Sequence, residues 1–367
     1  MKIKVALLHF GFKEYATELA NGLVNYVDLT VIQQEKNTQD AREVLDPRIS
    51  VKTFKKPDMH DPSNIQTMGE IMRLIRKVDP DILHVQEIND IWYLLTVLVL
   101  FKKMPPLVTT IHDISSHPGD GKKVFGSDYT RPIAFYRSQQ LIVHTEEQKT
   151  KLNQKFSIPN QKIHVLPHGE IGSWYKRHGH KNSPPREPCT LLFFGRIWPY
   201  KGLKYLLEAM PLIAEQMPEV KLIIAGRGEN MEQYFPNGYD PQRYDILNHF
   251  ITNEDVVSLF ARSTITVLPY IEASQSGVAA LSYGMGTPVV AFDVGGLSEI
   301  VRHEQDGLLV PPRDVKALAE SIIYLLKDHK LYSKMQSATL ARCQQDLNWA
   351  NIAEQTLEVY HQLAKAK

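Results

Sequence analysis

The stretch CTLLFFGRIWPYKGL, residues 189–203, decides the fold class of this chain. Its first part, Cys189–Phe194, is an apolar run typical of a buried strand, and a glycine turn follows it. Apolar side chains at helical spacing then run from Leu203 to Met217, and a second apolar run occupies Val220–Ala225. A strand, a helix and a strand in this order predict a β-α-β unit with parallel strands.

The same alternation of short apolar runs and amphipathic stretches continues on both sides of this unit. Upstream, it predicts strands at 3–8, 28–32, 81–85, 107–111, 141–144 and 163–166 and helices at 14–24 and 65–78. Downstream, it predicts helices at 256–261 and 277–285, strands at 265–268 and 288–292, and a last helix that opens at Trp349. The longest apolar run, Ile91–Phe101, predicts a further buried helix. Strands repeatedly separated by helices indicate parallel sheets under helical cover.

The length of 367 residues predicts two domains, because one hydrophobic core seldom serves so long a chain. Residues 172–188 are polar, contain three prolines and break the composition on both sides. We therefore predict an N-terminal Rossmann-like domain at 1–172, a linker at 173–188, a second Rossmann-like domain at 189–345, and a C-terminal helix at 346–367 that packs back on the first domain. The predicted fold class is α/β, with two doubly wound domains facing across a cleft. Ligands of such folds bind beyond the carboxyl ends of the strands.

Composition and charge exclude several classes of protein. Lys and Arg number 42 against 41 Asp and Glu, so the net charge of +1 gives no general attraction to nucleic acid. The two cysteines, Cys189 and Cys343, lie far apart, which excludes a disulfide framework and a thiolate zinc site and suits a reducing compartment. The N-terminus has no secretory signal pattern, and the run Ile91–Phe101 is about half the ~20 residues that span a bilayer. We expect a cytoplasmic protein, and the Lys102-Lys103 pair after that run leaves open a peripheral contact with the inner face of a membrane.

Two cations lie in the loop of the central stretch. Arg196 and Lys201 are five residues apart, between the end of a predicted strand and the start of a predicted helix at Leu203. A guanidinium and an ammonium beside a helix N-terminus suit a diphosphate. The alternative is a solvated basic loop, and the loop alone does not decide between the two.

Two further loops follow predicted strands of the same domain. Gly226-Arg227-Gly228 would let the backbone approach a nucleotide, although a lone G-x-G is more often a tight turn. The loop Glu272-Ala273-Ser274-Gln275-Ser276 leads into a helix at Gly277-Val278. The amides at such a helix start favour phosphates or sugar hydroxyls.

In this order and spacing, the motifs resemble those of glycosyltransferase family 4, the retaining nucleotide-sugar transferases of the GT-B fold. The resemblance covers essentially the whole chain. It is carried by DILHV at 81–85, TIHD at 110–113, VLPHG at 165–169, the Arg196/Lys201 loop, GTPVVA at 286–291 with its Gly295-Gly296 turn, and WANIA at 349–353. No one motif is decisive, and their collinearity makes the resemblance specific.

The resemblance implies roles for particular residues. Arg196 and Lys201 match the pair that grips the donor diphosphate, and His112 matches the histidine that faces the donor sugar. These three are the predicted catalytic residues. Together with the loops described above, the predicted donor-binding residues are Gly11, Phe12, Gly226, Gly228, Ile251, Asn253, Glu272, Ser274, Gln275, Ser276, Gly277 and Val278. Among these, Gly11 and Phe12 match the glycine loop near the transferred sugar, and Ile251 and Asn253 match the segment that holds the nucleotide base.

The chain departs from the family at one place. The family typically has a Glu, seven residues and a second Glu ahead of the Gly-Thr-Pro at Gly286, and here those positions hold Ala273 and Leu281. In the family the second Glu accepts hydrogen bonds from ribose hydroxyls, which Leu281 cannot do. Glu272 lies one position earlier and could replace the first Glu only if the loop shifts. Either donor recognition is rebuilt on the neutral groups of residues 274–276, or catalysis is impaired.

The resemblance therefore implies a retaining glycosyltransferase. It would move a sugar from a UDP- or GDP-linked donor to a glycan or lipid-linked acceptor, as in surface polysaccharide or glycolipid biosynthesis. No cofactor and no nucleic-acid partner are expected. No metal is expected either, because Asp79-Pro80-Asp81 has the D-x-D form of a metal motif but lies at a helix-to-strand turn. Two alternatives stay open: a non-catalytic GT-B subunit that binds a sugar nucleotide, and a GT-B epimerase or phosphorylase.

Overall fold

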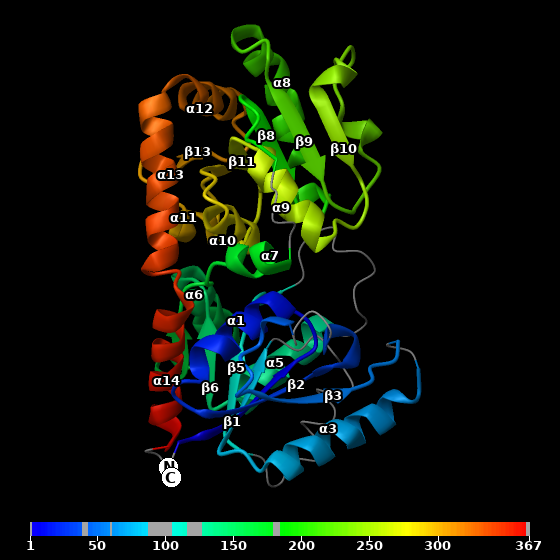
Figure 1. Ribbon diagram of the computed structural model, residues 1–367, viewed down its shortest axis with the longest axis vertical. Helices are drawn as coiled ribbons and strands as arrows, with labels where there is room; N and C mark the ends of the chain where they lie inside the picture. Colours follow the sequence, from blue (N-terminus) through cyan, green and yellow to red (C-terminus); the bar gives the residue numbers. More distant parts are fainter. Residues whose placement is uncertain are drawn as a thin grey trace. The chain divides into compact units, whose positions relative to one another are not determined.

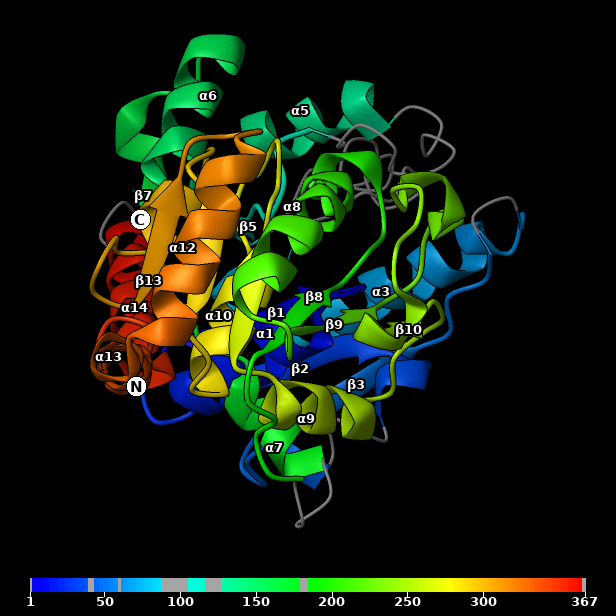
Figure 2. The same cartoon turned by 90° about the horizontal axis from the view of Figure 1, so that it is seen from above.

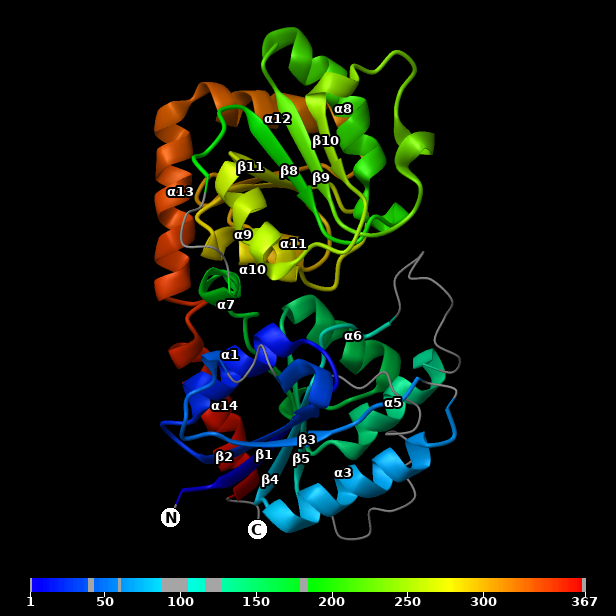
Figure 3. The same cartoon turned by 45° about the vertical axis from the view of Figure 1, so that its right-hand side comes forward.

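The structure, a computed structural model, describes residues 2–38, 43–58, 61–86, 105–115, 127–178 and 184–364. Figure 1 labels its elements, Figure 2 shows them from above, and Figure 3 shows them after a turn about the vertical axis. The chain divides into two compact units: Met1–Ser116, Gly121–Pro167 and Trp349–Lys367 form the first, and His168–Asn348 makes up most of the second. Each unit holds one sheet, and all the strand pairs in the described residues are parallel. The predicted parallel α/β architecture with two sheets is confirmed.

The first unit contains a seven-stranded sheet in the order β3-β2-β1-β4-β5-β6-β7. Its strands are β1 (Lys4–His9), β2 (Asp28–Gln34), β3 (Ser50–Phe54), β4 (Ile82–Gln86), β5 (Leu107–Thr110), β6 (Gln140–Val143) and β7 (Ile163–Val165). Its helices are α1 (Lys13–Leu23), α3 (Asn64–Val78), α5 (Ser127–Arg137), α6 (Glu146–Phe156) and α14 (Trp349–Ala364). The chain builds outward from β1 to β3 and then returns to place β4 beside β1. The strand order therefore reverses between β1 and β4, as in doubly wound folds.

Helices cover both faces of this sheet because alternate side chains of each strand point to opposite faces. Leu8, Val85 and Val143 join one apolar cluster with residues of α3, α5 and α6. On the other face α1 packs against α14, and Figure 3 shows the red C-terminal helix beside the blue α1.

The C-terminal helix is fixed to the first unit by close packing and by a buried hydrogen-bond chain. A side chain at Gly22 of α1 would collide with the Trp349 carbonyl, so glycine permits the contact of the two helices. Nδ1 of His84 shares a hydrogen bond with the Tyr360 hydroxyl (2.6 Å), and its Nε2 shares one with Oγ1 of Thr110 (2.8 Å). Burial lowers the pKa of His84 to about 3, so the imidazole is neutral at neutral pH, with one ring nitrogen donating and the other accepting.

The second unit contains a six-stranded sheet in the order β10-β9-β8-β11-β12-β13. Its strands are β8 (Thr190–Phe194), β9 (Lys221–Ala225), β10 (Tyr244–Leu247), β11 (Ile265–Leu268), β12 (Val289–Phe292) and β13 (Gly307–Val310). Its helices are α7 (Gly172–His178), α8 (Leu203–Gln216), α9 (Asn253–Arg262), α10 (Gly277–Gly284), α11 (Leu297–Ile300), α12 (Val315–Lys327) and α13 (His329–Gln344). The strand order reverses again, here between β8 and β11. The largest apolar cluster of this unit joins the sheet to α8 and α12.

The structure differs from the sequence-based expectations at several places. Strands β3, β10 and β13 and helices α5, α6, α12 and α13 were not predicted. Helix α7 occupies the first part of the segment 173–188 that was expected to be a linker, and the two units divide between Pro167 and His168. The predicted helix at Ile91–Phe101 lies outside the described residues. Within those residues, no helix is long and apolar enough to cross a membrane.

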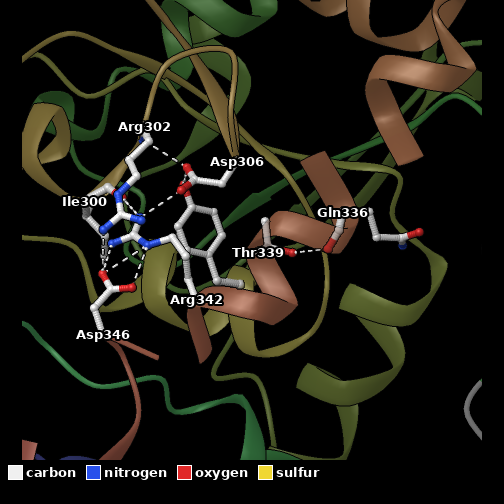
Figure 4. Close-up of polar contacts among 8 residues, drawn as sticks. Ile300, Arg302, Asp306, Gln336, Thr339, Arg342 and Asp346 are labelled. Carbon is white, nitrogen blue, oxygen red and sulfur yellow. Dashed lines mark hydrogen bonds and ion pairs between the residues drawn. The ribbon is translucent and has the colours of Figure 1, made fainter. Parts of the chain in front are cut away.

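A buried ion pair holds α13 to the rest of the second unit (Figure 4). Arg342 donates from Nη1 to Asp306 (2.9 Å) and from Nη2 to Asp346 (2.7 Å). The side chains of Arg342 and Asp306 are only 7% and 1% exposed. The Tyr283 hydroxyl of α10 and the backbone N–H of Arg302 also donate to Asp306, at 2.6 and 2.9 Å. Because each charge has several partners, the desolvation cost of burying the pair is offset.

We predict that Arg342→Met lowers the free energy of unfolding by about 3–5 kcal/mol, since it leaves Asp306 buried without its cation. Arg302→Met is the matched control, because Arg302 also reaches Asp346 (3.0 Å) but its side chain is 46% exposed. It should cost less than about 1 kcal/mol. Urea denaturation measures the free energy of unfolding of both variants. Equal losses would show that the buried ion pair contributes no more to stability than the exposed one.

Candidate functional site

The central stretch forms a tight loop at the carboxyl end of β8. Gly195 and Gly202 bound it and have φ angles of 113° and 68°, which favour glycine. A Cβ at Gly202 would collide with the Pro269 carbonyl, so this loop lies directly against the segment that follows β11. A hydrogen bond from Ile271 N to the Tyr200 carbonyl (2.9 Å) joins the same two segments.

The predicted diphosphate-binding cations are arranged around two buried tyrosines. Nη2 of Arg196 donates to the hydroxyl of Tyr200 (3.0 Å). Nζ of Lys201 lies 3.7 Å from the ring centroid of Tyr270, close enough for a cation–π interaction. Burial raises the pKa of Tyr270, so its hydroxyl stays neutral beside the ammonium. The structure therefore brings Arg196 and Lys201 together where the strand order reverses between β8 and β11.

The loop of residues 272–276 lies on the same edge and prepares the start of α10. Ser276 caps the helix, because its hydroxyl accepts a hydrogen bond from Ala279 N (3.2 Å). Glu272 is exposed and Ser274 is buried. The Oε1 atom of Gln275 is buried and has no hydrogen-bond partner among the described residues. Buried polar atoms are nearly always satisfied, so Gln275 is the member of this loop that best fits a ligand contact.

A packing role accounts for Gly226 and Gly228. A Cβ at either position would strike the backbone of residues 195–197, and Gly195 N donates to the Ala225 carbonyl (2.9 Å). The loops after β8 and β9 thus lie backbone to backbone. Nucleotide contacts from these glycines stay a prediction.

The two positions that depart from the family are apolar and buried. Ala273 is 5% exposed and Leu281 is 2% exposed. Leu281 belongs to an apolar cluster with Ile251 and Val256, the latter in α9. Asn253, the first residue of α9, is half-buried beside this cluster. The region predicted to hold the nucleoside is therefore hydrophobic at position 281.

The first unit brings Gly11, Phe12 and His112 together at the carboxyl ends of β1 and β5. The Phe12 ring stacks on the His112 ring with centroids 4.0 Å apart and an interplanar angle of 15°. Phe12 is 40% exposed, whereas His112 is fully buried. The φ angle of Phe12, 52°, is rare for a residue with a side chain and places the ring over the imidazole.

Hydrogen bonds orient the His112 ring through a second histidine. Nδ1 of His144 contacts the Leu166 carbonyl (3.0 Å), so this nitrogen is the donor. Nε2 of His144 shares a hydrogen bond with Nδ1 of His112 (3.2 Å). Nε2 of His112 points to the side-chain amide of Gln86 (3.2 Å).

His168 lies beside the predicted donor-binding residue Gly277, and sequence reasoning did not select it, although it belongs to the VLPHG motif. Its Nδ1 donates to the Gly169 carbonyl (2.8 Å), and its Nε2 would lie 3.7 Å from a Cβ placed on Gly277. The imidazole therefore lies under the start of α10. By contrast, the carboxylate of Asp81 accepts from Lys4 N (3.0 Å) at the amino end of β1, the opposite edge from the site.

Two parallel sheets with the same order reversal, and a pair of cations at the reversal point of the second, define a class of two-domain transferases with the GT-B fold. The chain matches the family model "Glycosyl transferases group 1" over residues 188–328 and the model "Glycosyl transferase 4-like" over residues 4–145. The matches cover most of the chain, which therefore belongs to this family of glycosyltransferases.

Solved structures and relatives agree with this assignment. Sucrose-phosphate synthase from Thermosynechococcus elongatus has a similar fold, with a TM-score of 0.74 at 20% identity over 99% of both chains. An Anabaena protein solved in complex with UDP and glucose has a TM-score of 0.71 at 18% identity, over 98% of this chain and 99% of that one. D-inositol 3-phosphate glycosyltransferase from Pseudarthrobacter chlorophenolicus is 25% identical over 96% of this chain and 90% of its own length.

The buried His168 predicts a loss of stability in mild acid. Burial lowers the pKa of His168 from 6.5 to about 4. Between pH 4 and pH 6.5 this imidazole is therefore mostly protonated in the unfolded chain and mostly neutral in the folded chain. The resulting stability is fully present above pH 6.5 and is lost as the pH falls toward 4, by about 3 kcal/mol. Urea denaturation at pH 7 and pH 4.5 should therefore show a smaller decline for His168→Gln than for the wild type. Equal declines would contradict the assignment of a neutral, buried imidazole.

Proposed function

We propose that this glycosyltransferase moves a sugar, with retention of configuration, from a UDP- or GDP-linked donor to a glycan or lipid-linked acceptor. The observation that carries the proposal is the cluster of Arg196 and Lys201 with two tyrosines at the reversal point of the second sheet. Two cations at such a point suit a diphosphate. The UDP and glucose bound to the Anabaena protein, and the inositol phosphate in the name of the Pseudarthrobacter relative, support donor and acceptor classes of this kind.

In the proposed reaction the acceptor hydroxyl attacks the anomeric carbon from the face that the diphosphate leaves. The bond from the anomeric carbon to the diphosphate oxygen breaks as the new glycosidic bond forms, and the leaving phosphate takes the proton of the acceptor. Arg196, Lys201 and the amides at the start of α10 stabilise the charge that develops on the diphosphate. His112 faces the donor sugar. The scheme uses no cofactor and no metal ion.

Donor recognition in this proposal uses neutral groups where the family uses carboxylates. Gln275, with its unsatisfied carbonyl oxygen, supplies a hydrogen-bond acceptor near the start of α10. Leu281 and Ile251 belong to one buried apolar cluster, so position 281 offers the ribose no carboxylate. Each neutral hydrogen bond contributes about 0.5–1.5 kcal/mol, less than one to a carboxylate, so the donor should bind with modest affinity.

A second candidate function is a non-catalytic subunit that binds a sugar nucleotide. It is favoured by one observation, the burial of Ala273 and Leu281 among apolar side chains, where the family's carboxylates would be costly. It predicts donor binding without turnover. The transferase proposal instead predicts slow hydrolysis of the donor in the absence of an acceptor.

We place the transferase in the cytoplasm, at the inner face of the membrane when the acceptor is lipid-linked.

We predict that Lys201→Ala or Arg196→Ala weakens donor binding about ten- to a hundredfold and abolishes transfer, because each removes charge-assisted hydrogen bonds to the diphosphate. A thermal-shift titration with UDP- and GDP-sugars measures the affinity, and release of nucleoside diphosphate measures turnover. Lys204→Ala is the control, since Lys204 is an exposed residue of α8 that pairs with Glu208 at 3.7 Å. Turnover near the wild-type level in both site variants would refute the assignment of the diphosphate site.

A further inference from the structure

Two buried tyrosines lie against the two cations of the second unit. Tyr200 belongs to the loop that follows β8, and Tyr270 is the second residue after β11. The two tyrosines are 2% and 1% exposed, whereas Arg196 is exposed and Lys201 is half-buried. The cations are therefore accessible to a ligand, while the tyrosines that contact them are not.

An aromatic ring makes the contact at Lys201. Nζ of Lys201 lies 3.7 Å from the ring centroid of Tyr270 and 5.2 Å from that of Tyr200. Both distances are within the ~6 Å range of cation–π attraction, which is stronger where the ring is shielded from water. Because this attraction comes from the face of the ring, the contact with Tyr270 does not need the phenolic hydroxyl.

A hydroxyl makes the contact at Arg196. Nη2 of Arg196 donates to the hydroxyl of Tyr200 at 3.0 Å. The guanidinium carbon lies 6.0 Å from the ring centroid of Tyr200, at the outer limit of cation–π attraction. The hydrogen bond is therefore the main contact between these two side chains, and it needs the oxygen atom of Tyr200.

Backbone and core contacts hold both tyrosines in place. The backbone N–H of Ile271, next to Tyr270, donates to the carbonyl of Tyr200 (2.9 Å). The side chain of Tyr270 also packs in an apolar cluster with Ala279 and Tyr283 of α10. A side chain in a close-packed cluster stays in one rotamer. The ring of Tyr270 is therefore a fixed surface for the ammonium.

A fixed cation binds an anion better than a mobile one. A long side chain that is immobilised only when the ligand binds weakens the affinity by about three- to tenfold. A carboxylate in the place of either tyrosine would hold the cation but would compete with the phosphate oxygens for it. A neutral tyrosine holds the cation and leaves its charge for the ligand.

We propose that Tyr270 and Tyr200 are positioning residues for the diphosphate. The ring of Tyr270 holds the ammonium of Lys201, and the hydroxyl of Tyr200 holds the guanidinium of Arg196, before the diphosphate binds. The inference rests on the proposed function for the identity of the ligand, and it adds the neutral groups that prepare the cations for it. It predicts opposite results for the same substitution at the two positions.

The experiment titrates inorganic pyrophosphate, the smallest diphosphate, into the full-length chain by isothermal calorimetry. Tyr200→Phe removes only the hydroxyl and should weaken pyrophosphate binding about three- to tenfold, because Arg196 is no longer held. Tyr270→Phe keeps the ring, so the affinity should stay at the wild-type value. Tyr270→Leu removes the ring and should weaken binding about three- to tenfold.

A control variant and the melting temperatures separate positioning from a loss of structure. Tyr205→Leu is the control, because Tyr205 is a half-buried tyrosine of α8 whose ring meets that of Phe292 (5.7 Å), and it should leave the affinity unchanged. Both phenylalanine variants keep the volume of the side chain, so they should melt near the wild-type temperature. Tyr270→Leu should melt earlier, as a large-to-small change in a core does. The comparison of the two phenylalanine variants holds even if Tyr270→Leu fails to fold.

Four results would overturn the proposal. They are an absence of pyrophosphate binding to the wild type, wild-type affinity in Tyr200→Phe, wild-type affinity in folded Tyr270→Leu, and an affinity of Tyr270→Phe as low as that of Tyr200→Phe. Hydrolysis of the nucleotide sugar by the wild type tests the glycosyltransferase reaction separately. Opposite effects of the two phenylalanine variants without hydrolysis would support the positioning role and refute the transferase, and hydrolysis with equal effects would do the reverse.

Discussion

The parallel arrangement of every described strand is the constraint on which the rest of the structure depends. Parallel strands need helical crossovers, so all the carboxyl ends of a sheet lie on one edge. In both units the strand order reverses after three strands, between β1 and β4 and between β8 and β11. The loops on either side of a reversal leave in opposite directions and leave room for a ligand. The two groups of candidate site residues lie at these two points.

The two units use different chemistry at equivalent places. After β8 and β11, cations lie over tyrosine rings, as Lys201 does over Tyr270, and this arrangement suits an anion. After β1 and β4, the described residues include buried amides and imidazoles, and His9 with Gln33 is an example. A nucleotide sugar and its acceptor contain both kinds of group, charged diphosphate and neutral hydroxyls.

Sequence alone predicted the buried strands at the centre of both sheets. Strand β11 was predicted with the observed bounds, and α14 with its observed first residue, Trp349. The edge strands β3 and β10 were missed because their side chains, as in SVKTF at 50–54, are mixed and only partly buried. Arg196 and Lys201 could be found because they lie close together in the sequence, in a loop between a predicted strand and a predicted helix. His168 could not, because its significance depends on burial and on its position under the start of α10, which a sequence does not reveal.

The position of His112 also depends on a residue that is remote in sequence. Tyr15 of α1 meets the His112 ring edge-on, with centroids 4.8 Å apart, and meets Trp349 of α14 in the same way at 4.8 Å. Edge-to-face contacts of this kind favour a fixed ring orientation. The C-terminal helix, which the Tyr360–His84 hydrogen bond holds in place, therefore supports Tyr15, and Tyr15 supports the imidazole. For this reason the return of the chain to its first unit belongs to the construction of the site as much as to the stability of the fold.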